Sequence, residues 1–155
     1  MRKVVLPFVV AALLVLSGSD AIAGALTQTM HFGSFVQDIT GVSCAGPVGD
    51  IAIDANGNGV IHFTANTTGS WFTATFEGTG TVTVTSPGTA PAVYTGHFQL
   101  WDSDEANLQN AVSHATLNFD GADASGASFH MHAAFQMTLN ANGTLTASHF
   151  TASCS

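Results

Sequence analysis

Beyond its third residue this chain contains no lysine and no arginine; the only two, Arg2 and Lys3, stand at the N-terminus. Proteins that bind nucleic acids or anionic membranes neutralise phosphates with these side chains, so both are poor partners for this chain. Ordinary salt bridges are nearly absent too, and core packing and sheet hydrogen bonds must hold the fold. Apart from Arg2 and Lys3, side-chain cations can come only from the seven histidines: His31, His62, His97, His114, His130, His132 and His149.

The N-terminal segment has the three parts of a secretory signal. Residues Met1–Lys3 are positively charged, Val4–Leu16 form an apolar run that is short for a membrane-spanning helix, and Ala21–Ala23 form a small-x-small cleavage site. We expect a bacterial Sec-type signal peptide over residues 1–23, cleavage after Ala23 and an extracellular protein without membrane contact after cleavage.

The expected mature protein, residues 24–155, is long enough for one domain with a sizeable core. Loss of Arg2, Lys3 and Asp20 on cleavage would change the formal net charge from −8 to −9. The sequence therefore predicts a single acidic domain.

The chain has two cysteines, Cys44 and Cys154. An even number of cysteines in an exported protein indicates disulfide bonding, so we expect these two to be joined. The bridge would tie the extreme C-terminus to an early loop. Chain-entropy arguments assign a loop of this length about 4–5 kcal/mol of stabilisation.

Apolar and polar residues alternate with a period of two along most of the chain, and helix formers are scarce, which indicates β-strands. The clearest strand is Ala127–Asn140, with apolar residues at odd positions and mostly polar residues, including His130 and His132, at even ones. Asn142–Gly143 predicts a hairpin turn after it. The other predicted strands are Leu26–Thr40 (one long bent strand or two short ones), Val60–Ala65, Trp71–Glu77, Thr79–Thr85, Ala92–Trp101, Ala111–Phe119 and Thr144–Ala152.

About eight strands joined mostly by short turns predict an all-β fold with an antiparallel meander, because the long crossovers of parallel sheets are missing. Such strands close into a small β-barrel, which we favour, or pack as a β-sandwich. Asp102–Asn110 is predicted to be a polar loop or a single helical turn. Asp54–Gly59 matches the start of a calcium loop, but Ala65 stands where that loop needs a glutamate, and a hairpin turn is favoured.

Three motifs resemble segments of small secreted actinobacterial proteins of uncharacterised function. They are Ile61–Thr64, Tyr94–Phe98 and the stretch from Asn107 and Asn110 to His114–Thr116, within a resemblance that covers roughly Ile51–Phe135 and the terminal cysteine. The resemblance implies secretion and a bacterial source, and no activity. In architecture alone, the predicted barrel is similar to lipocalin-like and streptavidin-like barrels, and the sequence has a fingerprint of neither.

Four histidines are each followed by phenylalanine, and neighbours in a strand point to opposite faces. If the phenylalanines join the apolar face, the histidines share the polar one. His130 and His132 would then lie about 6–7 Å apart, and a third histidine from a paired strand, His114 or His149, would complete a Zn or Cu centre. The alternative is a set of solvated, hydrogen-bonded histidines on a Thr-rich surface.

A second hypothesis for the polar face is a pocket for a small ligand. Its expected residues are His62, Trp71, His97, Trp101 and His114. No catalytic residue is predicted, because the nucleophile-elbow, phosphate-loop and zinc-protease motifs are absent.

The sequence thus favours a secreted non-enzymatic protein that binds a small ligand or metal ion through a His/Thr/Trp-rich face. One alternative is a secreted enzyme that uses histidines on this face, with Glu77 as an acid/base partner; a histidine held by a carboxylate in a concavity would favour it. The other is an extracellular structural protein, which dispersed histidines on a flat surface would favour.

Overall fold

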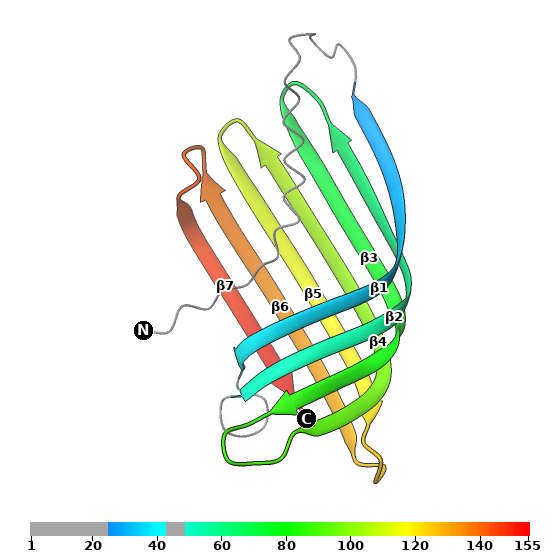
Figure 1. The fold of residues 1–155 in the computed structure, drawn as a ribbon. Coiled ribbons are helices and arrows are strands. Elements are labelled where there is room, and N and C mark those ends of the chain that lie inside the picture. The colour runs from blue at the N-terminus through cyan, green and yellow to red at the C-terminus, as the bar shows by residue number, and fades with distance from the viewer. Residues whose placement is uncertain (1–24, 43–48) are drawn as a thin grey trace.

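The computed structural model describes residues 25–42 and 49–155, and 82% of them lie in strands. The seven strands form one antiparallel sheet in sequential order (Figure 1). They are β1 (Leu26–Val42), β2 (Gly49–Ala65), β3 (Gly69–Thr85), β4 (Ala92–Asn107), β5 (Asn110–Ala122), β6 (Ser128–Asn140) and β7 (Leu145–Cys154). The predicted all-β antiparallel meander is confirmed. The expected signal segment, residues 1–23, lies outside the described residues.

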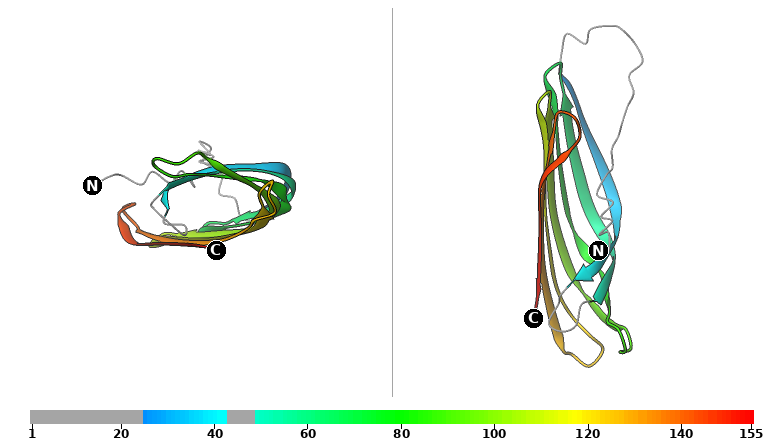
Figure 2. Two further views of the ribbon diagram at one scale, coloured as in Figure 1. Left: turned by 90° about the horizontal axis from the view of Figure 1, so that it is seen from below. Right: turned by 90° about the vertical axis from the view of Figure 1, so that its left-hand side faces the viewer.

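The sheet is strongly curled but does not close. Figure 1 shows the lower parts of β1–β4 crossing in front of β5–β7, and the end-on view in Figure 2 shows a flattened ring whose two edge strands stay apart. In the described residues β1 and β7 are the two edges and do not pair. The edges differ in length, 17 residues against 10, and β1 has two register shifts in its pairing with β2. The favoured closed barrel is therefore an open, curled sheet.

Seven strands replace the expected eight because two predicted strands are one, and two further segments lengthen strands that the sequence suggested would be shorter. Trp71–Glu77 and Thr79–Thr85 are one strand, since Gly78 keeps its pairing on both sides. Asp54–Gly59 lies inside β2, between β1 and β3, and is neither a hairpin turn nor a calcium loop. Asp102–Asn107 extends β4 and is not a loop or a helical turn.

Four of the described hairpin turns, all except the β3–β4 turn, are built around Asn and Asp side chains that accept backbone N–H groups. The Oδ1 atom of Asn66 accepts from Thr68 and Gly69, and the Oδ1 atom of Asp123 accepts from Ser125 and Ala127. Equivalent bonds follow Asn107 and Asn140 in the β4–β5 and β6–β7 turns. Such turns are short and of fixed geometry, so they set the register of the strands that they join.

The inner face of the curled sheet is apolar and forms the core. Phe98 and Phe119, whose ring centroids lie 4.6 Å apart, are almost fully buried there, and Tyr94 stacks on Phe129 at 4.5 Å. Cys154 packs against this core and is not a free cysteine. Cys44 lies outside the described residues, so its pairing with Cys154 stays a prediction.

Asp102 is an exception to the apolar inner face. Its register partners, Ala74 on β3 and Ala115 on β5, are buried inner-face residues. Burial raises the pKa of the Asp102 carboxyl from 3.8 to about 6, and the neighbouring Asp104 carboxylate adds to the rise. At neutral pH the fold therefore holds a poorly solvated negative charge.

We expect Asp102→Asn to raise the free energy of unfolding at pH 7.5 by about 1–2 kcal/mol, a figure reduced for the partial exposure of this group. Below about pH 3.5 Asp102 is mostly neutral in both states. Between about pH 4 and pH 6 the unfolded chain loses this proton and the folded chain keeps it, so stability falls as pH rises. Urea titrations should show a gain at pH 7.5 that vanishes near pH 3.5.

The matched control is Glu105→Gln on the exposed part of β4, which should change little at either pH. An equal effect of both substitutions, or a gain from Asp102→Asn that does not depend on pH, would contradict the burial argument.

Candidate ligand-binding site

The outer, convex face carries the polar chemistry of this protein. By strand register all seven histidines lie on this face, opposite the buried residues, and none of them is buried. Trp71 and Trp101 lie there too, with exposed fractions of 41% and 44%. The predicted division into an apolar and a His/Thr/Trp-rich face is therefore how the sheet is arranged.

One row of polar side chains crosses this face from β2 to β7. Its members pair in register, each with the next: Asn58, Glu77, Gln99, Asn118, His132 and Ser153. We call these six residues the polar row. Neighbouring strands lie about 4.8 Å apart, so the row spans about 24 Å. It offers amide, carboxylate, imidazole and hydroxyl groups in an unbroken line.

Two shallow hollows lie along the polar row and share Gln99. The first has a volume of about 390 Å³ and lies between Asn58 and Gln99, with Thr75 and Glu77 in its lining. The second has a volume of about 420 Å³; its lining residues are Gln99, Asn118, Asp120, His130, Met131, His132, Ser153, Cys154 and Ser155. The polar row therefore lies along a hollowed surface.

Trp101 and a group of acid–histidine pairs flank the polar row on opposite sides. Trp101 follows Gln99 by two residues on β4, and its register partners are Thr75 and Thr116. On the other side lie His97, Asp120 and His130, which pair across β4–β6. An aromatic surface thus borders the row on one side and ionisable groups border it on the other.

Hydrogen bonds hold the imidazoles beside the second hollow. Nδ1 of His130 lies 2.6 Å from Oδ1 of Asp120, and Nδ1 of His132 lies 2.7 Å from Oδ1 of Asn118. Because these oxygens are acceptors, each Nδ1 carries the proton, and Nε2 of the neutral ring is left with a lone pair. Both imidazoles are therefore oriented before any ligand arrives.

The register does not assemble the predicted metal centre. Asn118 pairs with His132, whereas His114 and His149 both pair with Gln136, four residues away along β6. Four residues of strand measure about 13 Å, too far for a shared ion. Across residues 25–42 and 49–155 no group of three or more His, Cys, Asp or Glu side chains is placed to hold a metal.

One feature that would favour the enzyme hypothesis, a histidine held by a carboxylate, is present in the structure. Two histidines have carboxylate partners: His130 with Asp120, and His97 with Glu77, whose Oε1 lies 3.2 Å from Nε2. These side chains are well solvated, with exposed fractions of 55% and 69% for His130 and Asp120. Within the described strands no hydroxyl is hydrogen-bonded to either imidazole, so no nucleophile is assigned.

The five predicted ligand residues share the outer face but not one pocket. Trp101 and His97 flank the polar row directly. His62 and His114 lie one row beyond Trp101, where His62 is hydrogen-bonded to Thr29 at 3.0 Å, and Trp71 lies further still. Sequence reasoning missed Asn58 and Ser153, because only the register of all six strands shows that they continue the row.

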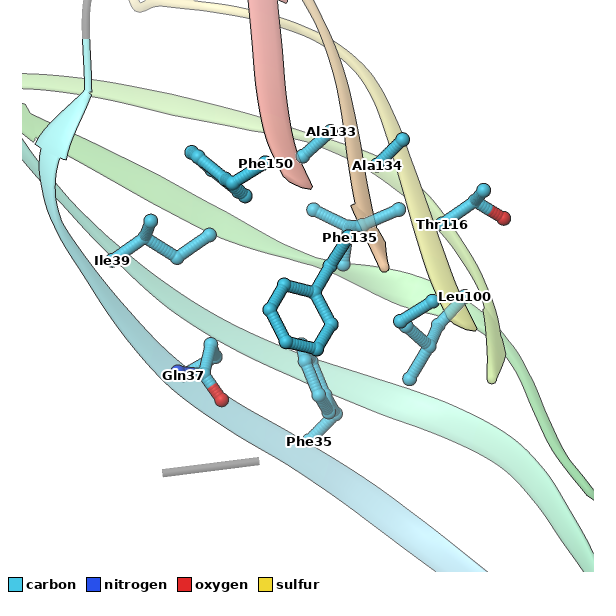
Figure 3. A pocket seen from close by; sticks show the side chains of 11 residues that line it. Phe35, Gln37, Ile39, Leu100, Thr116, Ala133, Ala134, Phe135 and Phe150 are labelled. Atoms are coloured by element: carbon cyan, nitrogen blue, oxygen red, sulfur yellow. The ribbon is translucent and has the colours of Figure 1, made fainter. Parts of the chain in front are cut away.

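A second, apolar cleft lies on the inner face between β1 and β5–β7 (Figure 3). Phe35, Phe135 and Phe150 line it beside the buried Gln37, whose Nε2 donates to the carbonyl of Asp38 at 2.8 Å. Its volume of about 20 Å³ is close to the room that one water needs. The inner cleft is too small for an organic ligand, and the outer face is the better candidate site.

No protein-family model, curated protein or solved structure matches this chain. In the described part of the chain, no helix is long and apolar enough to cross a membrane. Function therefore has to be inferred from the residues of the chain itself.

Proposed function

We propose that this protein is a secreted, non-enzymatic binding protein whose outer face holds a neutral oligosaccharide. The observation that supports the proposal is the unbroken polar row beside the exposed indole of Trp101. A sugar ring presents hydroxyl groups at its edges and C–H groups on its faces. Amide and carboxylate side chains hydrogen-bond the former, and a flat aromatic ring packs on the latter.

Charge narrows the class of sugar. The expected mature chain carries a net charge of −9 and has no lysine or arginine to pair with carboxylate, sulfate or phosphate groups. Glu77 within the row and Asp120 beside it add negative charge. An anionic polysaccharide would be repelled, so a neutral chain fits the site best.

The shape of the row favours an oligomer over a single sugar. The step from one strand to the next, about 4.8 Å, is close to the length of one sugar ring, so successive rings could meet successive side chains. The two hollows that share Gln99 extend the surface along the same line. Because a sheet is rigid, and because His132 is already held by Asn118, little ordering is needed on binding.

Trp101→Ala is expected to weaken binding at least about tenfold, because truncating a central aromatic anchor commonly costs more than 1.4 kcal/mol. Calorimetry would use neutral glucose, galactose, mannose and xylose oligomers, chosen from an array screen, with polygalacturonate as the anionic comparison. Trp71→Ala is the matched control, since Trp71 is an equally exposed indole away from the row.

Equal losses from the two tryptophan variants would contradict the proposed site. Failure to bind any neutral oligomer on a broad array would contradict the proposed function. Breakdown of a bound oligomer during the titration would favour the enzyme alternative, with the Asp120–His130 pair as the first residues to substitute.

A further inference from the structure

Strand β7 presents a free, uncharged edge. It pairs only with β6 among the described strands, and nearly all of its residues are exposed. Its sequence, Leu145–Cys154, contains no Asp, Glu, Lys, Arg or Pro. Charges, prolines and bulges are the devices by which edge strands usually avoid pairing with another chain. Strand β7 has no charge or proline, and its one register shift lies near its start, between Leu145 and Ala147, so the segment from Ser148 onward stays in regular pairing with β6.

The opposite edge of the sheet is protected. Strand β1 carries Asp38 and has register shifts between Phe32 and Ser34 and between Ile39 and Val42. These irregularities interrupt the row of backbone groups that a partner strand would need. The contrast indicates that the β7 edge, and not the β1 edge, is open to a partner.

The hydrogen bonds of the last residue show which backbone groups face outward. Ser155 exchanges both backbone bonds with His130, at 2.8 and 3.0 Å. In an antiparallel pair such residues alternate, so Ser153, Thr151 and His149 also bond to β6. The N–H and C=O groups of the residues that alternate with them therefore point to the free edge: Ser148, Phe150 and Ala152.

Charge favours a second copy of this chain as the partner. Each of β1–β5 carries at least one Asp or Glu, whereas β6 and β7 carry none. Two strongly acidic molecules repel each other, and the repulsion is smallest where their carboxylate-free strands meet. The edge is also suited to two-fold pairing, because the small residues Ser148 and Ala152 stand symmetrically about Phe150.

We propose that two copies associate by antiparallel pairing of their β7 strands about a two-fold axis at Phe150. Phe150 of each copy lies opposite Phe150 of the other, and Ser148 lies opposite Ala152. The Phe150 side chain, on the inner face and 36% exposed, is then covered by its counterpart. The axis stands perpendicular to the sheet, so both polar rows lie on the same side of one continuous surface.

Sedimentation velocity and light scattering on the mature, oxidised protein should show a concentration-dependent dimer. Ala152→Pro should give a monomer, because it removes an edge N–H that the β6–β7 ladder does not use. Phe150→Lys should do the same by placing two cations at the axis. Thr151→Lys, with the same new side chain on the outer face of β7, should stay dimeric.

A monomer at every concentration would overturn the proposal. So would dimers that persist in Ala152→Pro and Phe150→Lys while circular dichroism shows both variants folded. If Ala152→Pro does not fold, the comparison of the oligomeric states of Phe150→Lys and Thr151→Lys tests the proposal instead. Because these measurements use no sugar, their outcome is independent of oligosaccharide binding.

Discussion

Loss of the predicted Cys44–Cys154 disulfide should lower the free energy of unfolding by about 4–5 kcal/mol, the value expected for a closed loop of more than 100 residues. Small domains have only about 5–15 kcal/mol in total, so this is a large share. The architecture gives the bridge a particular role. Cys154 ends β7, and Cys44 belongs to the segment between Val42 of β1 and Gly49 of β2.

The disulfide would therefore join the first hairpin to the last strand. In the described residues no backbone hydrogen bonds connect these two sides of the curled sheet. Packing of the inner faces holds them together, including Phe35 and Ile39 of β1 near Phe150 of β7. A covalent link would remove the unfolded conformations in which the two edges are far apart.

Urea titrations of the oxidised protein, the reduced protein and the Cys44→Ser/Cys154→Ser variant test this expectation. The last two should unfold at the same, lower urea concentration, and reductant should have no effect on the double variant. Intact-mass measurement after alkylation reports the redox state. Alkylation of both cysteines in the folded, unreduced protein would show that the disulfide does not exist.

Which side of the sheet a residue occupies could be read from the sequence because it is a local property. Neighbours in a strand point to opposite faces, so the buried Phe129 and Met131 required His130 and His132 to face outward. The same reasoning placed Trp101 and His97 on the outer face. All-β class, antiparallel order and the two faces follow from alternation and short turns.

Which outer residues meet could not be read from the sequence, because register is not local. His132 meets Asn118 and not His114 because the β5–β6 turn at Asp123 brings Ala122 opposite Ser128. A shift of two residues would preserve both faces and change every pair. The residues of the predicted metal centre and those of the polar row lie on the same face, and only the strand register decides which of them are neighbours.

Strand lengths and barrel closure were also beyond the sequence pattern. The predicted strands Trp71–Glu77 and Thr79–Thr85 leave out Gly78, and isolated glycines do weaken strands. In the structure Gly78 lies inside β3, opposite Gly57, where an added Cβ would approach the Asn56 carbonyl oxygen to 2.4 Å. Several inner-face glycines are needed because neighbouring backbone lies directly over them, a contact that arises only once the sheet is curled.

Gly96→Ala is expected to destabilise the fold by about 3 kcal/mol, the upper part of the range for overpacking. Gly96 lies on the inner face of β4 and pairs with Gly80 and Gly121, which also lack a Cβ. A Cβ at position 96 would approach the carbonyl oxygen of Asp120 to 2.1 Å and Cα of Gly121 to 2.4 Å. Both atoms are backbone, so β4 and β5 would have to move apart.

The control is Gly33→Ala in β1, where the nearest atom to an added Cβ is the Gly57 carbonyl oxygen at 3.9 Å and φ is not positive. This change should alter stability by less than about 1 kcal/mol, because alanine also lowers the entropy of the unfolded chain. Thermal unfolding of both variants beside the wild type gives the comparison. Equal stability of the two variants would mean that β4 and β5 can separate freely at this point. The curl would then not depend on close backbone contact, and the hollows above Gln99 and Asn118 would lose the rigid support on which binding by the polar row relies.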